Sequence, residues 1–149
     1  MLAGLAACTT GTATTVTSTT VTGIVVRADT ISAERGCGAR PGQVYRYAAV
    51  VARQATPEVA LGAEIYDCFA DAAFVNLPPD QSERYDFVVR VFAFDEPGYS
   101  SQKAAIEGAP ADLAGVLPAL GALKSLGKAD CQVSQVRTVQ TVASCEALR

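Results

Sequence analysis

Short apolar runs alternate with turn residues along most of the chain, beginning near Val21. The runs have the length of strands and are rich in β-branched and aromatic residues, a pattern typical of an all-β fold. Val133, Val136, Val139 and Val142 supply the apolar positions of the last two strands, although their spacing of three also fits one face of a helix. The pattern predicts strands at 21–28, 44–51, 60–69, 73–77 and 85–94, and a final hairpin within 131–145.

The segment 85–94 is the clearest strand of the chain. Its odd positions, from Tyr85 to Ala93, form one apolar face. Its even positions begin polar and become aromatic at Phe92 and Phe94. A strand with apolar residues on both faces belongs at the centre of a sheet. Residues 95–98, Asp-Glu-Pro-Gly, predict a turn after it, because Pro fixes φ and Gly supplies a positive φ.

One segment, 112–124, has the pattern of a helix. Asp112 is a suitable N-cap, and leucines follow at helical spacing, although Pro118 should kink or break the helix. We predict a short helical insertion near 112–124 that is buried against the sheets. An apolar surface exposed to a partner or to a membrane interface is the alternative. The segment is too short and too interrupted to span a bilayer.

The tract 9–22 is a low-complexity polar stretch in which nine of fourteen residues are Thr. It has no apolar face long enough to be buried. Such an uncharged and flexible composition predicts a tether that holds a folded domain away from a surface. An exposed β-strand is the alternative, since Thr favours extended backbone.

The residues before this tract end in Leu5-Ala6-Ala7-Cys8, which resembles the lipobox of bacterial lipoproteins. The resemblance implies that signal peptidase cuts before Cys8 and that Cys8 carries a lipid. Only seven uncharged residues precede Cys8, fewer than a signal peptide needs, so we expect the start to be truncated or to lie upstream. An ordinary buried strand or a cloning remnant is the alternative.

Four cysteines remain when Cys8 is set aside, namely Cys37, Cys68, Cys131 and Cys145. An even number behind an export-like start predicts two disulfides. Three pairings are possible. We favour Cys37–Cys68 and Cys131–Cys145, because the last two cysteines flank a short segment that can fold back as a hairpin. Four buried free thiols in a cytosolic protein are the alternative.

The chain contains no histidine, and this limits the chemistry open to it. An enzyme would have to use carboxylates, Tyr, Lys or Cys. The sequence has no nucleophile-elbow, P-loop or dinucleotide-binding motif. A net charge of −3 without a basic run argues against nucleic acid as a partner. We therefore predict no catalytic residues and no cofactor.

Two other groups of polar residues are candidate sites. Asp67, Asp71 and the pair Asp95-Glu96 could be drawn into a hard-cation site, but their spacing resembles no known calcium loop. Solvated carboxylates are the favoured interpretation, and we predict no metal site. The second group could line a ligand face and consists of Tyr45, Tyr47, Tyr66, Tyr85 and Tyr99. Tyr45 and Tyr47 should lie on the same side of their strand, where a core role or a half-buried sheet face is the favoured interpretation.

Leu77-Pro78-Pro79, followed by the segment 85–93, resembles the passage into strand F of fibronectin type III and immunoglobulin-like domains. The resemblance implies an antiparallel immunoglobulin-like β-sandwich in which Tyr85 is the corner tyrosine. It also implies that Val89 and Val91 point into the core. A different antiparallel sandwich is the alternative.

These features predict a signal-peptide remnant at 1–8, a Thr-rich tether at 9–22 and a β-sandwich domain at 23–149. The expected function is that of a non-enzymatic lipoprotein of the bacterial cell envelope, which binds a protein or glycan partner or has a structural role. With Thr9 after the lipidated cysteine, the resemblance implies the outer membrane in a two-membrane bacterium. A small secreted enzyme that uses carboxylates, or an enzyme accessory module, is the alternative.

Overall fold

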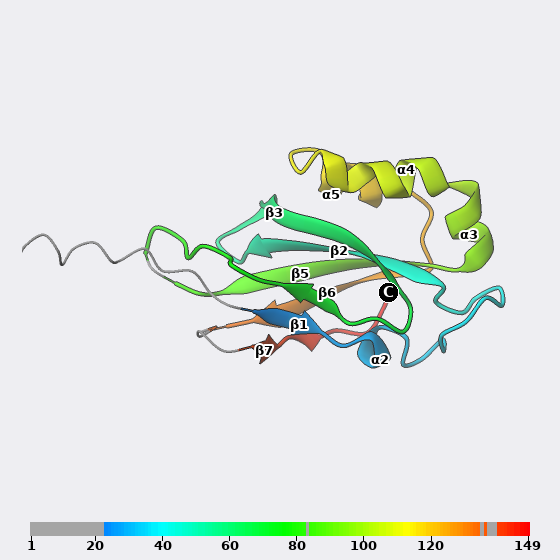
Figure 1. Cartoon of the computed structure of the whole chain (residues 1–149), viewed down its shortest axis with the longest axis horizontal. Helices are drawn as coiled ribbons and strands as arrows, with labels where there is room; N and C mark the ends of the chain where they lie inside the picture. Colours follow the sequence, from blue (N-terminus) through cyan, green and yellow to red (C-terminus); the bar gives the residue numbers. More distant parts are fainter. Residues whose placement is uncertain (1–22, 83, 135, 137–139) are drawn as a thin grey trace, which may run out of the picture.

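The computed structural model of the protein describes residues 23–149, except 83, 135 and 137–139. A five-stranded antiparallel sheet forms the centre of this part (Figure 1). Its β5 has a neighbour on each side, as predicted for the segment 85–94. In spatial order the strands are β3 (Thr56–Asp67), β2 (Arg46–Arg53), β5 (Phe87–Phe94), β6 (Gly127–Val133) and β8 (Ser144–Cys145).

A smaller, three-stranded sheet packs against one face of the large sheet (Figure 1). Its central strand, β1 (Ile24–Val26), pairs antiparallel with β4 (Ala72–Phe74) and parallel with β7 (Thr141–Val142). The core between the sheets includes Ile24, Val26, Phe74, Phe87, Val89 and Val91. The fold is therefore rich in strands that form two packed sheets, as predicted.

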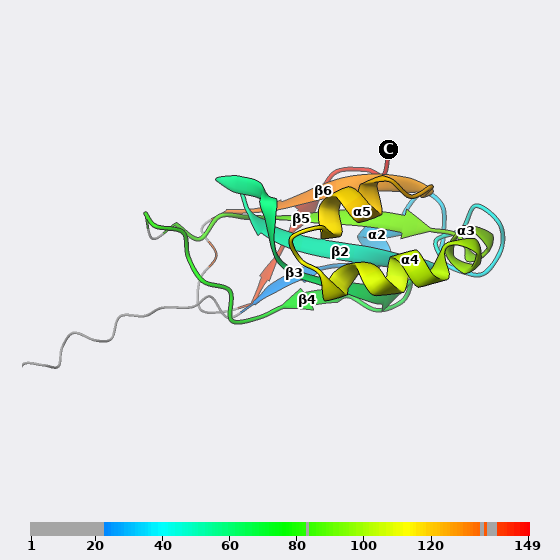
Figure 2. The same ribbon diagram turned by 90° about the horizontal axis from the view of Figure 1, so that it is seen from above.

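Short helices cover the other face of the large sheet (Figures 1 and 2). They are α3 (Glu96–Ser101), α4 (Lys103–Gly108), the 3-10 turn η2 (Ala109–Ala111) and α5 (Val116–Gly121). Their buried side chains pack against even-numbered residues of β2 and β5, including Ala48, Val50, Phe92 and Phe94. One further helical turn, α2 (Ala28–Ile31), follows β1.

The turn predicted at 95–98 is instead the start of α3. The side chain of Asp95 caps the helix by accepting a hydrogen bond from the Gly98 N–H, and Pro97 stands in the first turn. Asp and Pro favour a helix N-terminus as much as a turn. Asp accepts a hydrogen bond from a free backbone N–H of the first helical turn, and Pro lacks an N–H that would have no partner there.

The helical insertion is also longer than predicted, since it spans 96–121 and not only 112–124. Asp112 is the C-cap residue of η2, and the N-cap of α5 is Gly115 instead. Pro118 is the third residue of α5, where its missing N–H breaks no hydrogen bond. Val116 and Leu120 are fully buried against the sheet, which confirms the predicted burial of this segment.

The hairpin between β2 and β3 was misplaced by the sequence analysis. The strand predicted at 60–69 begins earlier, at Thr56, and the turn before it consists of Gln54 and Ala55. Pro57 is tolerated here because β3 lies at the edge of the sheet, where a strand can lack an N–H.

The C-terminal segment crosses from one sheet to the other. β7 belongs to the small sheet, whereas β8 pairs with β6 in the large sheet. Val133 and Val136 are buried, but Val142 is 59% exposed, contrary to its predicted apolar role, because β7 is an edge strand and turns this side chain outward. Val139 lies outside the described residues. None of the helices within the described ranges is long and apolar enough to cross a membrane.

Candidate functional site

Both favoured disulfides are present. Cys37–Cys68 joins the loop before β2 to the turn after β3. Cys131–Cys145 joins two residues that lie opposite each other on β6 and β8. All four cysteines of the described part are thus paired. Cys8 and the tract 9–22 lie outside the described residues.

The carboxylates that were weighed as a cation site serve local structure instead. Asp67 accepts a hydrogen bond from the Phe69 N–H at 3.1 Å, and Asp71 accepts one from the Ala28 N–H at 2.7 Å. Asp95 caps α3 and also accepts from the Gly42 N–H at 3.0 Å. Within the described ranges, no three His, Cys, Asp or Glu residues are grouped so as to hold a metal ion.

The two tyrosines at the start of β2 lie on opposite faces of the large sheet, contrary to the prediction. Tyr47 faces the small sheet and stacks on Tyr66, with 5.4 Å between ring centroids. Tyr45 faces the helices and meets Tyr99 edge-on at 5.7 Å. The alternation of side chains fails because β2 begins at Arg46, so Tyr45 precedes the regular strand.

Arg46 lies between two aromatic rings where β2 meets the helices. Its guanidinium is 5.0 Å from the ring centroids of both Tyr45 and Tyr99. Its Nη1 donates to the Tyr99 hydroxyl at 3.3 Å, and that hydroxyl donates to the Glu107 carboxylate. We call these four residues the Arg46 cluster. Because they come from β2, α3, α4 and the residue before β2, the cluster ties the helical layer to the sheet.

The Arg46 cluster offers binding groups but no activated nucleophile. Burial and the nearby Glu107 raise the pKa of Tyr99, so the phenol stays protonated at neutral pH. The hydrogen bond to Tyr99 raises the pKa of Arg46. A shallow hollow of about 400 Å³ lies beside the cluster and is also lined by Ile65 and Tyr66. Asp67 lines it too, so a ligand there would meet a cation, two carboxylates and aromatic rings.

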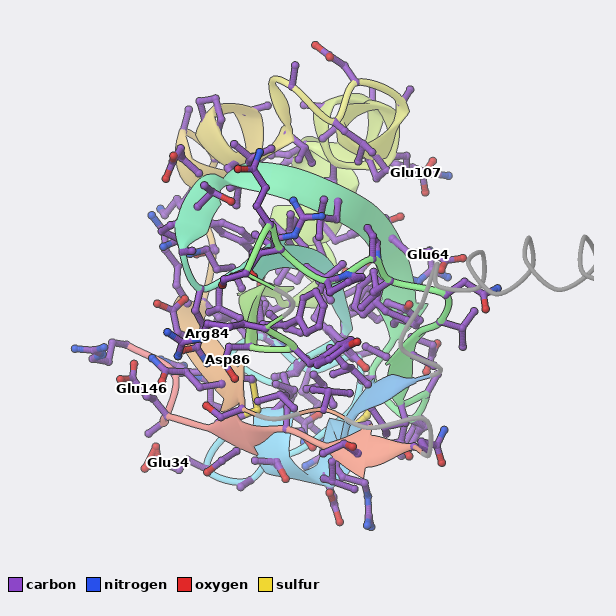
Figure 3. All side chains as sticks on the ribbon, turned by 90° about the vertical axis from the view of Figure 1, so that its left-hand side faces the viewer. Glu34, Glu64, Arg84, Asp86, Glu107 and Glu146 are labelled. Atoms are coloured by element: carbon purple, nitrogen blue, oxygen red, sulfur yellow. A yellow bond between two sulfur atoms is a disulfide. The ribbon has the colours of Figure 1, made fainter. Side chains whose placement is uncertain are left out.

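A larger groove, which the sequence analysis missed, runs between α5 and the strands β5 and β6. Its volume is about 500 Å³. We call it the α5 groove; its lining consists of Arg90, Val91, Phe92, Leu117, Gly121, Lys128, Ala129, Asp130 and Arg149. The groove and the Arg46 cluster lie on the same helix-covered face of the large sheet. The groove is at β5, β6 and α5, whereas the cluster is at β2, α3 and α4. In Figure 3, Glu107 of the Arg46 cluster and Glu146, the partner of Arg149, lie on opposite sides of the molecule.

Strand register brings the charges of the α5 groove together. Arg90 lies opposite Asp130, and Phe92 lies opposite Lys128, on the same face of the sheet. Arg90 Nε is 3.6 Å from Asp130 Oδ1, an ion pair too long for a hydrogen bond. Arg90 is a cation in the middle of an otherwise apolar central strand. That irregularity is the signal by which the sequence could have pointed to this groove.

Lys128 and Arg149 supply the other cations of the groove. Lys128 Nζ is 3.5 Å from the Gly121 carbonyl oxygen at the end of α5 and 5.8 Å from the centroid of the Phe92 ring. Arg149 Nη2 is 2.6 Å from a Glu146 carboxylate oxygen. The backbones of Lys128 and Arg149 also exchange two hydrogen bonds, which fix Arg149 at the rim.

Comparison with known proteins identifies no relative: no protein-family model, curated protein or solved structure matches the chain.

Proposed function

We propose that the protein is a lipid-anchored protein of the bacterial cell envelope whose folded domain is a non-enzymatic binding module. The pairing of cysteines carries this proposal. The four cysteines of the folded domain form two disulfides with each other, which leaves Cys8 as the fifth cysteine. Cys8 follows Leu5-Ala6-Ala7 and precedes the Thr-rich tract, which is the context of a lipidated cysteine.

The two disulfides support a location outside the cytoplasm. Disulfides form and persist in the periplasm, on cell surfaces and in secreted proteins, whereas cytosolic thiols are kept reduced. A lipid anchor would hold the protein in the cell envelope, where disulfides persist. The alternative is a secreted protein without an anchor.

The strand order supports an immunoglobulin-like sandwich as part of this proposal. In such domains strands G, F, C and C′ form one sheet and strands A, B and E are neighbours in the other. Here β6, β5, β2 and β3 follow the order G–F–C–C′, and β7, β1 and β4 follow A–B–E. The strand in the A position comes from the C-terminal end of the domain and runs parallel to β1. Tyr85 precedes the F-like β5 and packs against the core.

A binding role is favoured over catalysis because the tyrosines that line the hollow beside Arg46 are poor bases and nucleophiles at neutral pH. Burial raises the pKa of Tyr99 and Tyr66, which makes their phenols poorer bases and nucleophiles at neutral pH. The expected partner is a protein or a glycan of the envelope.

Detergent partition of the protein from its source cells tests the anchor. The protein should enter the detergent phase, and Cys8→Ala should move it to the aqueous phase, because the acyl chains are lost. Thr9→Ala is the matched control, since it alters the tether and leaves the cysteine. If the wild-type protein and the Cys8→Ala variant partition alike, the anchor is refuted.

A further inference from the structure

The outer edge of β3 is the longest free strand edge in the described part of the chain. β3 has twelve residues and lies at one side of the large sheet, where β2 is its single partner (Figure 2). The other edge strands of the two sheets, β4, β7 and β8, have three residues or two. None of the residues of β3 is buried. A long exposed edge can pair with another strand, whereas a very short one offers too few backbone groups.

The register shows which backbone groups of β3 point outward. Just beyond the strand, the Cys68 N–H donates to the Tyr45 carbonyl oxygen at 3.2 Å, in line with the register of β3 and β2. In an antiparallel pair, residues that bond to the partner strand alternate with residues that do not. Counting back from Cys68, every second residue bonds to β2. The N–H and C=O groups of Ala63 and Ile65 therefore point away from β2.

This edge lacks the features that usually prevent strand edges from pairing. Proteins protect edges with Lys, Pro or an irregular register. β3 contains no Lys or Arg, and its proline, Pro57, is the second residue of the strand. The register shifts lie between Thr56 and Gly62, and the pairing with β2 is continuous from Gly62 to Asp67. The second half of β3 is thus a regular edge that remains open.

The hollow beside the Arg46 cluster borders the same half of β3. Its lining consists of Ile65, Tyr66 and Asp67 of β3 with Arg46, Tyr99 and Glu107. Ile65 packs against the helical layer, so the hollow lies on the helical face of the sheet. It holds two carboxylates against one guanidinium, which already donates to the Tyr99 hydroxyl. A strand added to β3 would place every second side chain on this face, where a Lys or Arg would meet the carboxylates.

We propose that the free edge of β3 binds an extended, basic segment of an envelope protein by strand addition. Backbone hydrogen bonds to Ala63 and Ile65 hold the segment, and a basic side chain enters the hollow. The charged residues of β3 are Glu58, Glu64 and Asp67, all acidic. A basic segment complements them, whereas β3 of a second copy of the chain would add like charges. The inference rests on the proposed function, because it names the partner class of the binding module.

Hydrogen exchange followed by NMR tests the proposal with a heptapeptide of alternating lysine and valine. In the free protein, the amides of Ala63 and Ile65 should exchange faster than those of Gly62 and Glu64, which bond to β2. At about nine-tenths occupancy, the peptide should slow exchange at Ala63 and Ile65 about tenfold and leave the other two unchanged, because only the free protein exchanges there. Unchanged exchange at Ala63 and Ile65 overturns the proposal.

Two altered peptides separate strand addition from a general effect of charge. The same peptide with N-methylated amides keeps its positive charge but has no backbone donor, so it should not slow exchange at Ala63 or Ile65. A peptide with glutamate in place of lysine should bind about fivefold more weakly or worse, since each exposed ion pair contributes up to about 1 kcal/mol. Equal binding of the lysine peptide and its N-methylated form would contradict strand addition.

Variants of β3 test the same contacts from the side of the protein. Ala63→Pro removes an outward N–H and no bond to β2, so it should abolish peptide binding, whereas Ala63→Ser keeps the N–H and should bind as the wild type does. Asp67→Asn should weaken binding about twofold to fivefold. Glu146→Gln is its control, because Glu146 lies on the opposite side of the molecule from Glu107 (Figure 3). Equal affinity of Ala63→Pro and Ala63→Ser refutes the proposal, and if Ala63→Pro does not fold, the N-methylated peptide decides.

Analytical ultracentrifugation without peptide distinguishes a second copy of the chain from a different protein. A monomer with fast exchange at Ala63 and Ile65 supports the proposal. A dimer in which these amides are protected would overturn it, because the edge would then be occupied by a second copy. All these measurements use the full, oxidised chain with Cys8→Ser, which has no free thiol for cross-linking. Their outcome is therefore independent of the detergent partition that tests the anchor.

Discussion

The hydroxyl group of Tyr66 joins the two sheets at one edge of the sandwich. It donates to the Glu64 carboxylate at 3.1 Å and lies 3.3 Å from the Ala73 carbonyl oxygen, and it accepts from the Ala73 N–H at 3.4 Å. Its ring stacks on Tyr47. Burial is the main cause that raises the pKa of Tyr66 to about 12. An ionised phenol would lose both its solvation and its role as a donor here.

We expect the stability of the domain to fall at alkaline pH, in part because of Tyr66. Its pKa rises from 10.0 when unfolded to about 12 when folded, so the protonated form is favoured by folding. This contribution is complete below pH 10 and is lost as the pH rises towards 12. Urea unfolding at about pH 9 and about pH 11 should give a smaller pH dependence of the free energy of unfolding for Tyr66→Phe than for the wild type. Tyr45→Phe, whose phenol lies on the other face, should retain the wild-type dependence.

Individual residues were predicted well where a covalent or periodic rule applied to them. The cysteine pairing followed from even number and proximity in sequence, and Val89 and Val91 followed from strand alternation. Tyr45 was assigned to the wrong face because alternation holds only inside a strand, and the sequence does not mark where β2 begins. Arg90 stands out in the sequence as a single charge among apolar residues, but the sequence does not show that Asp130 and Lys128 lie across the sheet beside it.

The helical layer is the element that sequence reasoning described least well. α3, α4 and α5 have six residues each, too few for a helical period to emerge. Such short helices are stabilised mainly by packing on the sheet. In α4 only Ile106 is buried, so the sequence of this helix contains a single apolar position that indicates the packing. The strands were easier to predict because β2 and β5 are apolar on both faces.

Substitutions in the last helix should measure how much this packing contributes. Leu120 of α5 is fully buried against the sheet, whereas Leu113, which precedes the helix, is 38% exposed. Leu120→Ala should lower the free energy of unfolding by about 2–5 kcal/mol, since it leaves a cavity against the sheet. Leu113→Ala should change it by about 0.5 kcal/mol or less. Similar losses for the two variants would show that α5 is not packed as described.

At the scale of the whole molecule, one disulfide ties the loop before β2 to the turn after β3, and the other ties β6 to β8. Cys37–Cys68 closes a loop with a sequence separation of 31, and Cys131–Cys145 closes one of 14. The second disulfide holds β8, which has only two residues, against β6. The order of strands within the sheets could not be predicted, because it depends on which distant segments meet and not on local pattern.

Removal of each disulfide should destabilise the fold according to its loop length. Replacing Cys131 and Cys145 with Ser should cost about 3 kcal/mol, and replacing Cys37 and Cys68 about 4 kcal/mol, because the unfolded chain regains loop entropy. Urea unfolding measures both. Cys8→Ser, which removes a cysteine but no disulfide of the domain, should leave the free energy of unfolding unchanged. Mass measurement should show a gain of four hydrogens when the wild-type protein is reduced.

The place of β1 in the small sheet has a mechanical consequence. The segment 9–22 leads directly into β1, and β1 has β4 on one side and β7 on the other. A force that pulls on Gly23 along the axis of β1 would load the hydrogen bonds to both neighbours in shear, all at the same time. A strand pulled away sideways from an edge would break them one after another, at lower force. A pull on Gly23 along the axis of β1 is therefore the direction in which the small sheet resists best.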